Sequence, residues 1–541
     1  MLALMVSFTV LGLVLRRQRV APRKRRTVAA ARSHWRNMRP RFRFDHLAMP
    51  PVRVLAPPAA ILALLACVLA WGAAPALAAK KRPFVYVVVV DGLDGDSVET
   101  GEAPFISSLL AGEGGRGTYF PESSSVIPAE TNPNHTAMMT GAFPGQSGIA
   151  ANAFAIYAPL ENEDTCARTG PLDFTAMPTP TSGESPTCPR AETIFESVRR
   201  QKGRRHPTTA AIMGKPKLGR IFDVSYRGRR AADYLWAPCD DPPDDDEYCD
   251  DVPTNPVTGY AANDTIVMDE VIRTVEEGVP SRGRTRRPRF TFVNLPQVDS
   301  AGHALGRGGV YDAIVGQADA EIERLVGTLK DEGIWGRSVL MVVSDHSMDS
   351  TPTKVNATGI LEDAGIPSDS FTVVQNGSVD FVYLANRRGP KRARNELLAQ
   401  MRAALLAEPD IAEAYYRRRN PLDGGMRFTV DGARPGWTAG PRTGDIMVTA
   451  EPGAAFSDPG ELDNPLPGNH GAPQTADNFM AVLGGWPRIR TVTVEDKGRR
   501  SRVRNAGVAS TAMRLLGMRP PADNSGRPLA AAFRRGALRR R

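Results

Sequence analysis

The sequence predicts an α/β protein with a mostly parallel central sheet and helices on both of its faces. Three apolar runs, 84–90, 289–295 and 338–344, are rich in β-branched residues. Continuous apolar runs of this length are typical of parallel strands buried on both faces. Segments with apolar residues at helical spacing lie between them, the clearest being 311–332. Strands that alternate with helices predict an α/β fold.

The first half of the predicted domain begins with the strand 84–90. A helix near 133–140 ends at Gly141, where a glycine and the following Pro144 stop helical periodicity. The stretches 152–190 and 236–262 are rich in Pro, Asp and Thr, and we expect loops there. The other expected elements of this half are a helix at 103–110, a helix at 191–200, a strand at 208–213 and a helix at 264–277.

The second half continues the same rhythm. Ile314, Ala318, Ile322, Leu325 and Leu329 share one face of the predicted helix 311–332. Further expected elements are strands at 371–374, 379–384 and 444–448 and helices at 395–407 and 508–516. The domain prediction is a leader at 1–79, a catalytic domain at 80–525 with loop-rich cap insertions around 152–285 and 385–465, and a basic tail at 526–541.

The leader is expected to direct export. An Arg-rich stretch precedes an apolar segment, 54–79, which ends Ala76-Leu77-Ala78, a small-x-small pattern that precedes signal cleavage. A membrane anchor is the alternative, since 54–79 is nearly long enough to span a bilayer. A lipoprotein signal at Cys67 is a further alternative, and translation could start at Met49 instead of Met1. We expect a secreted or cell-surface protein.

The basic charge of the chain belongs to this leader. The formal net charge is +9, yet residues 1–79 hold 13 Lys/Arg and one Asp. The remainder therefore carries 55 basic and 58 acidic residues. A body with a slight acidic excess gives no indication of a nucleic-acid-binding surface.

Four cysteines follow the leader: Cys166, Cys188, Cys239 and Cys249. An even number in an exported chain favours two disulfides, and the local pairing is Cys166–Cys188 with Cys239–Cys249. A cysteine zinc site is the alternative, although the spacing includes no CxxC.

Metal-ligand side chains follow three of the predicted strands. Asp91 follows the first strand, Asp299 and His303 follow the second, and Asp345-His346 follow the third. Ligands bind at the carboxyl ends of the strands in open α/β sheets. His470 lies in the glycine-flanked turn Gly468-Asn469-His470-Gly471. Oxygen and nitrogen ligands without a thiolate suit a catalytic zinc site.

Thr131 is the candidate nucleophile. It lies just before the predicted helix in Glu130-Thr131-Asn132-Pro133, where a simple helix cap is the alternative role. A helix N-terminus also stabilises an anion such as phosphate.

These motifs resemble one family. Thr131-Asn132-Pro133-Asn134-His135, the stretch 139–149, Asp299 to His303, Ser344 to Met348 and Asn469-His470-Gly471 follow the order of the nucleotide pyrophosphatase/phosphodiesterase branch of the alkaline phosphatase superfamily. The resemblance covers about residues 84–480. It implies an alkaline phosphatase-like fold and a small phosphorylated substrate.

The resemblance also implies two zinc ions, or another divalent metal. One would be held by Asp91, Asp345 and His346 and would bind the Thr131 oxygen; the other would be held by Asp299, His303 and His470. Asn152 matches a family asparagine that donates to a phosphoryl oxygen. His135 matches a residue that is not a ligand, and we expect it to make a supporting hydrogen bond. A phosphothreonine intermediate follows from this assignment.

Two departures from the residue pattern of this family affect the choice of substrate. Asn132 replaces the aromatic residue that usually follows the nucleophile in diesterases of this family, and Thr136 replaces another, so a nucleotide-stacking pocket is weakened. Lys215 and Lys217 follow the strand 208–213, and similarly placed basic pairs in phosphonoacetate hydrolase and some monoesterases contact the charged substrate. A solvated loop is the alternative for this pair.

The first functional hypothesis is phosphodiester or pyrophosphate hydrolysis. Phosphomonoester or phosphonate hydrolysis comes second. A sulfatase is disfavoured, because the chain has no Cys/Ser-x-Pro-x-Arg motif, and a phosphate mutase is disfavoured by the expected export. A non-catalytic binding protein on the same scaffold is the alternative from another class, which the intact ligand set disfavours.

Overall fold

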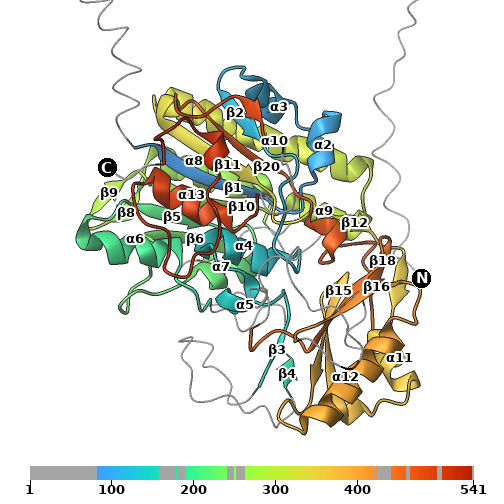
Figure 1. Ribbon diagram of the computed structural model, residues 1–541. Coiled ribbons are helices and arrows are strands. Elements are labelled where there is room, and N and C mark those ends of the chain that lie inside the picture. The colour runs from blue at the N-terminus through green and yellow to red at the C-terminus, as the bar shows by residue number, and fades with distance from the viewer. Residues whose placement is uncertain are drawn as a thin grey trace, which may run out of the picture. The chain divides into compact units, whose positions relative to one another are not determined.

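A nine-stranded sheet forms the centre of the computed structural model (Figure 1). The structure describes residues 82–157, 178–180, 189–239, 249–250, 262–418, 422, 440–458, 464–495 and 503–538, which all belong to the unit 65–541. The strand order is β21 (Val492–Thr493), β2 (Arg116–Tyr119), β20 (Met480–Gly484), β11 (Ser338–Val343), β1 (Phe84–Val90), β10 (Phe290–Leu295), β5 (Thr209–Ile212), β6 (Tyr234–Pro238) and β7 (Cys249–Asp250).

The middle of this sheet is parallel. β1 pairs in parallel with β10 on one side and β11 on the other, so that Val87 lies opposite both Phe292 and Met341. Parallel pairing continues through β5, β6 and β7, whereas β20 runs antiparallel to β11 and β2. Every residue of β1, β10 and β11 is buried. The predicted mostly parallel α/β architecture is confirmed.

Helices cover both faces of the sheet. Val85, Val87 and Val89 point into one apolar cluster, and Tyr86, Val88 and Val90 point into another, as the alternation of side chains along a strand requires. The first face is packed by α4 (Thr131–Thr140), α6 (Ile194–Lys202), α7 (Pro216–Phe222) and α13 (Gly507–Leu515). The second is packed by α3 (Pro104–Ala111), α8 (Asp264–Glu276) and α10 (Gly309–Asp331).

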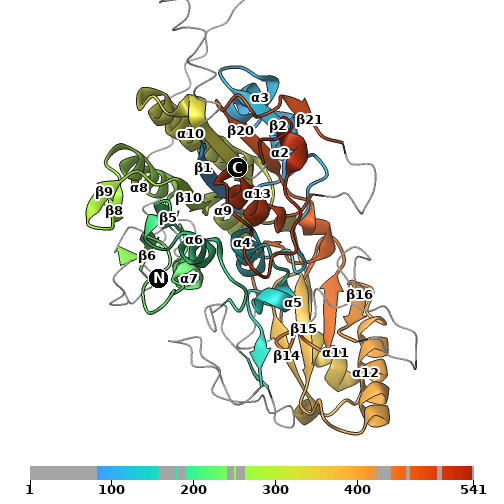
Figure 2. The same ribbon diagram turned by 60° about the vertical axis from the view of Figure 1, so that its left-hand side comes forward.

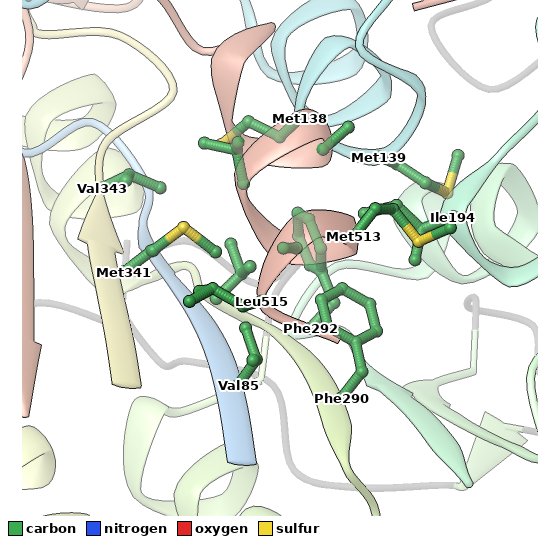
Figure 3. Close-up of a cluster of buried hydrophobic side chains, with 14 of the residues drawn as sticks. Val85, Met138, Met139, Ile194, Phe290, Phe292, Met341, Val343, Met513 and Leu515 are labelled. Carbon is green, nitrogen blue, oxygen red and sulfur yellow. The ribbon is translucent and has the colours of Figure 1, made fainter. Parts of the chain in front are cut away.

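The first of these clusters supports the helix that carries the candidate nucleophile. Figure 3 shows side chains of α4 and α13 among those of the sheet, with the labelled members Val85, Met138, Met139, Ile194, Phe290, Phe292, Met341, Val343, Met513 and Leu515. All ten are buried. The close packing fixes α4 against the strands whose ends carry the ligand residues.

A second sheet of four strands follows the order β14 (Phe371–Gln375), β15 (Val379–Leu384), β17 (Ile446–Ala450) and β16 (Ile411–Tyr416), all antiparallel (Figure 2). α11 (Ala357–Asp363) and α12 (Lys391–Leu405) pack against it. The remaining α-helices and strands are α2 (Gly95–Thr100), α5 (Pro144–Ser147), α9 (Gln297–Leu305), β3 (Ala155–Ile156), β4 (Thr179–Pro180), β8 (Val279–Ser281), β9 (Arg284–Arg286), β12 (Asp349–Ser350), β13 (Thr353–Val355), β18 (Ala454–Phe456) and β19 (Gly468–Asn469).

The C-terminal segment differs from the sequence-based expectation. We expected a basic tail from residue 526, yet Leu529, Ala532, Phe533 and Ala537 are buried in the cluster under α4 and α13. Apolar residues spaced among the arginines supply this contact, which the charge of the segment obscured. The leader 1–79 lies outside the described residues. Within the described part, no helix has the length and apolar character that a membrane span requires.

Candidate active site

The candidate ligands meet at the carboxyl end of the central strands. Asp91 follows β1 directly, and Asp345 and His346 follow β11. Asp299 and His303 lie four residues apart on α9, which begins after β10. Because β1 lies between β10 and β11, these three chain segments end at the same edge of the sheet.

Two overlapping groups of ligand atoms form there. Asp91, Asp345 and His346 form one group in which all ligand atoms lie within 4.8 Å of one another, and Asp299, His346 and His470 form another. His303 adjoins the second group: its Nε2 is 3.1 Å from His470 Nε2 and 3.4 Å from Asp299 Oδ1. The six residues expected as ligands therefore lie together, with His346 between the two sets.

The tautomers of the three histidines follow from their backbone contacts. Nδ1 lies 2.9 Å from the Gly468 carbonyl oxygen in His303, 3.0 Å from that of Ser347 in His346, and 3.1 Å from that of Ala129 in His470. A carbonyl oxygen only accepts, so Nδ1 carries the hydrogen in each neutral ring. Each Nε2 then presents a bare lone pair toward the carboxylates.

Lone pairs and carboxylate oxygens that face one another repel unless a cation lies between them. His346 Nε2 is 3.6 Å from Asp91 Oδ1 and 3.3 Å from Asp345 Oδ2. Within the described part of the chain, these two buried oxygens accept no hydrogen bond. Burial lowers the pKa of His303, and burial together with His346 and His303 lowers that of His470, so both rings are kept neutral. The arrangement fits a divalent metal with nitrogen and oxygen ligands.

The carboxyl groups respond differently to burial. Burial, reinforced by Asp345, raises the pKa of Asp91 to about 6. Burial also acts to raise the pKa of Asp345, but His346 and His135, whose Nδ1 lies 3.4 Å from Asp345 Oδ2, outweigh it and hold that pKa well below its usual range. Asp299 resembles Asp345: burial acts to raise its pKa, but Lys215 and the histidines around it hold that pKa well below its usual range.

Lys215 bridges the two ligand groups. Its Nζ lies 2.9 Å from Asp91 Oδ2 and 2.6 Å from Asp299 Oδ2, and the side chain is buried. These are the oxygens opposite to the Oδ1 atoms that face the histidines. The ammonium therefore holds one carboxylate of each group without filling the space between the Oδ1 and Nε2 atoms.

Lys217 occupies a different environment two residues along, in the first turn of α7. Among the described residues, its ammonium has no ion-pair or hydrogen-bond partner, although Asp299, Asp91 and Glu130 are close enough to act on it electrostatically. Burial and the neighbouring Lys215 lower its pKa. Of the two lysines expected at the substrate, Lys217 is the one whose charge is left available.

Thr131 is the first residue of α4, and Glu130 takes the N-cap position that we had considered for Thr131. The Thr131 hydroxyl oxygen lies 3.3 Å from His346 Nε2, and the residue is 1% exposed. The hydroxyl thus adjoins the group formed by Asp91, Asp345 and His346, at the positive end of a helix.

The segment before Thr131 is hydrogen-bonded to the turn that holds His470. Ala129 N donates to Gly471 O at 2.8 Å, and His470 Nδ1 donates to Ala129 O. Gly471 has φ +122°, and a Cβ there would come within 2.7 Å of Val379 Cγ1 and 3.3 Å of Glu130 Oε1. A glycine is therefore required where the ligand turn approaches the nucleophile segment.

Asn152 lies beside the start of α4. Its Oδ1 accepts a hydrogen bond from Asn132 N at 2.9 Å, and its own backbone N donates to Glu130 Oε2. Burial raises the pKa of Glu130 to about 8, against the lowering effects of the Asn152 backbone N–H and of Lys217. The expected phosphoryl contact of Asn152 stays a prediction.

His135 makes the supporting hydrogen bonds expected of it. Its Nδ1 is 2.9 Å from Thr131 O, and its Nε2 is 3.1 Å from Asn294 Nδ2. Asn294 also donates to Asp91 Oδ2 at 2.8 Å, so it links His135 to a ligand carboxylate. Sequence reasoning missed Asn294, although a polar residue in the apolar run 290–295 was the available signal.

Asn505 is a second residue that the sequence analysis missed. Its Nδ2 contacts the backbone oxygens of Ser344 and Asp345 at 3.2 and 3.0 Å and Asn134 Oδ1 at 3.1 Å. Asn134 Nδ2 in turn contacts the carbonyls of the segment before Thr131. Asn505 therefore joins the end of β11 to the nucleophile segment, and no local pattern in the sequence indicates this contact.

A family model and a curated relative both match this chain. The family model of type I phosphodiesterase / nucleotide pyrophosphatase matches residues 85–473. A curated relative from Saccharomyces cerevisiae (strain ATCC 204508 / S288c), named ectonucleotide pyrophosphatase/phosphodiesterase 1, is 23% identical over 432 residues, which cover 74% of this chain and 50% of the relative. The chain thus spans about half the length of that curated relative.

Solved structures show the same fold. Murine ectonucleotide pyrophosphatase / phosphodiesterase 5, as an inactive variant in complex with AMP, has a TM-score of 0.55 at 18% identity, covering 81% of this chain and 96% of that one. The human protein of that name has a TM-score of 0.54 at 18% identity, covering 81% and 95%. These structural matches establish an alkaline phosphatase-like fold, and the family model establishes that the chain belongs to the type I phosphodiesterase / nucleotide pyrophosphatase family.

Proposed function

We propose that this protein is an exported di-zinc hydrolase of phosphoric esters, which cleaves phosphodiester or pyrophosphate bonds. The observation that carries the proposal is the convergence of three bare imidazole Nε2 atoms and three buried carboxylates beside the Thr131 hydroxyl. Membership of the family and the hydrolase names of the relatives support it. The substrate is a small phosphorylated molecule.

The residues divide into two metal sites and a nucleophile. Asp91, Asp345 and His346 would hold one ion, and Asp299, His303 and His470 the other. Bound metal would supply positive charge for the attacking and leaving oxygens of an in-line displacement and would lower the pKa of the Thr131 hydroxyl. The same nitrogen and oxygen ligands also bind divalent ions other than zinc.

In this mechanism Thr131 Oγ1 attacks phosphorus and the bond to the leaving oxygen breaks. A phosphothreonine forms, and water then hydrolyses it. The Asn152 amide donates to a phosphoryl oxygen and stabilises the negative charge that gathers there in the transition state. His135 and Asn294 hold the Thr131 backbone and the Asp91 carboxylate in place. Lys215 holds Asp91 and Asp299 together through their Oδ2 atoms.

Hydrolysis of a phosphomonoester or a phosphonate is the second candidate. The ammonium of Lys217, which has no partner among the described residues, favours it, because a dianionic phosphoryl group carries one more charge than a diester for such a cation to bind. Lys215 was expected to share this role, but its ammonium is engaged by two ligand carboxylates.

Replacing Lys217 with Ala tests this choice. We expect kcat/KM for p-nitrophenyl phosphate to fall by about 10- to 100-fold relative to bis-p-nitrophenyl phosphate, since a hydrogen bond to a charged group contributes about 1.5–3 kcal/mol. Lys215→Ala should instead lower the metal content, because Lys215 contacts ligand carboxylates. Lys391→Ala, at the exposed start of α12, serves as the control. An unchanged monoester-to-diester ratio in Lys217→Ala would remove Lys217 from substrate recognition.

We also propose that the protein is exported and that its cysteines form disulfides. The apolar segment 54–79 would act as a signal or as a membrane anchor, and the relatives carry the name of ectoenzymes. β6 and β7 pair so that Ala237 lies opposite Cys249, two residues from Cys239, which supports a Cys239–Cys249 disulfide. Cys166 and Cys188 lie outside the described residues. Mass spectrometry of the unreduced, secreted protein would test both the mature start and the pairing.

A further inference from the structure

Glu130 is a buried carboxyl group next to the nucleophile that has no place in the mechanism so far. It occupies the N-cap of α4, yet its side chain makes no capping hydrogen bond to that helix. Its Oε2 instead accepts the backbone N–H of Asn152. Burial of a carboxyl group is costly unless it is hydrogen-bonded, and the Asn152 N–H satisfies Oε2, whereas the buried Oε1 accepts no hydrogen bond within the described residues.

Asn152 also contacts Asn132, the residue that follows Thr131. Its Oδ1 accepts from Asn132 N at 2.9 Å, and its backbone carbonyl accepts from Asn132 Nδ2 at 3.3 Å. The Asn132 N–H is one of the first N–H groups of α4, which have no partner inside the helix. Glu130 and Asn132, the two neighbours of Thr131, therefore both hold Asn152.

These contacts determine which way the Asn152 amide faces. A backbone N–H can only donate, so the atom of Asn152 that faces Asn132 N must be the carbonyl oxygen. The amide NH₂ then points to the opposite side. Among the described residues it has no acceptor, so it is left to donate to a ligand.

We propose that Glu130 is a positioning residue: through the Asn152 backbone it fixes the Asn152 amide beside Thr131, where that amide donates to a phosphoryl oxygen. This inference rests on the proposed function, because it assumes the phosphoryl contact of Asn152. Glu130 belongs to neither group of metal-ligand atoms. We therefore expect its effect on the hydrolysis of a diester to pass through Asn152.

A double-mutant cycle tests this dependence. The proteins are the wild type, Glu130→Ala, Asn152→Ala, the double variant and Glu130→Gln, each assayed for kcat and KM on bis-p-nitrophenyl phosphate. Asn152→Ala should lower kcat by about 10²- to 10³-fold, the usual effect of losing one such donor. Glu130→Ala should show most of that loss, and the double variant should be no slower than Asn152→Ala. Glu130→Gln keeps an acceptor for the Asn152 N–H and should stay within a few-fold of the wild type.

Glu196→Ala is the matched control. Glu196 is partly buried and also accepts a backbone N–H, that of Thr193 at 2.8 Å, but it lies on α6 and takes no part in the ligand groups. It should lose stability and keep kcat. Zinc content and thermal midpoint are measured for every protein, and the comparison of Glu130→Gln with Asn152→Ala stands even if Glu130→Ala does not fold.

The outcomes distinguish the positioning role of Glu130 from the phosphoryl contact of Asn152. Independent, multiplicative losses in the double variant, or a Glu130→Gln variant as slow as Asn152→Ala, overturn the positioning role while the function of Asn152 stands. A normal kcat in Asn152→Ala removes Asn152 from the proposed mechanism and the inference with it. A kcat loss in Glu196→Ala equal to that in Glu130→Ala reduces the effect of Glu130 to general stability and also overturns the role.

Discussion

Replacing Thr131 with Ala should abolish turnover while both metal sites keep their ions. The hydroxyl is the group that adjoins the metal-ligand atoms at the start of α4, 3.3 Å from His346 Nε2. The metal sites would keep all six of their Asp and His side chains in this variant. Loss of a nucleophile that forms a covalent intermediate typically lowers kcat by several orders of magnitude, in one well-studied case about 10⁶-fold. Zinc by mass spectrometry and kcat on bis-p-nitrophenyl phosphate are the two measurements.

Two further variants sharpen this experiment. Thr131→Ser keeps a hydroxyl and should retain measurable turnover. Thr136→Val is the control, because Thr136 is a buried threonine of the same helix whose hydroxyl forms no hydrogen bond within the described residues. Full activity in Thr131→Ala would exclude Thr131 as the nucleophile. Loss of zinc from that variant would make the hydroxyl a structural element of the site and would leave the nucleophile unassigned.

This experiment also separates the enzyme from a binding protein on the same scaffold. A binding protein would show no turnover before the substitution, and its affinity for a phosphorylated ligand would change little after it. An enzyme loses turnover but keeps its affinity for product, since the metal ligands and Lys217 are untouched.

The sequence predicted the parts of this protein that follow from short-range patterns. The runs 84–90, 289–295 and 338–344 became β1, β10 and β11 with boundaries shifted by at most one residue. The position of Asp91, Asp299 and Asp345 after these runs placed them at one edge of the sheet, because parallel neighbours end together. Spacing alone could not supply the position of His470, which reaches the site through the β12–β19 pairing and the Ala129 contact.

Other features depended on contacts between distant residues. Lys215 was expected to contact substrate, but a charge pattern cannot show that its ammonium lies between Asp91 and Asp299. Asn505 contacts the backbone of Asp345 across 160 residues, and such a contact leaves no periodic trace. The segment 526–541 was expected to be a basic tail because six of its sixteen residues are arginine, yet its apolar residues Leu529, Ala532, Phe533 and Ala537 pack into the core.

Removal of the metal should abolish activity and also lower the thermal stability of the protein. Three buried carboxylates, Asp91, Asp299 and Asp345, converge there, and the Lys215 ammonium contacts two of them, Asp91 and Asp299. Without divalent ions this arrangement holds an excess of buried negative charge, which is destabilising. A ligand that binds only the folded state contributes stability in proportion to the logarithm of its concentration over its Kd. Chelation by 1,10-phenanthroline should therefore lower Tm by several degrees, and added zinc should restore both Tm and kcat.

Substitution of His346 complements the chelation experiment, because His346 belongs to both groups of ligand atoms. His346→Ala should lose metal from both sites, so added zinc should restore neither its activity nor its Tm. His206→Ala is the matched control, since His206 is also buried but pairs with Asp233 outside both groups. Both variants lose a buried imidazole, so a difference between them in zinc content reports the metal site and not the loss of packing. An active, pure protein that contains no divalent ion and is indifferent to the chelator would refute the di-metal centre, because Asp91 Oδ1 and Asp345 Oδ2 would then face the bare His346 Nε2 with no cation between them.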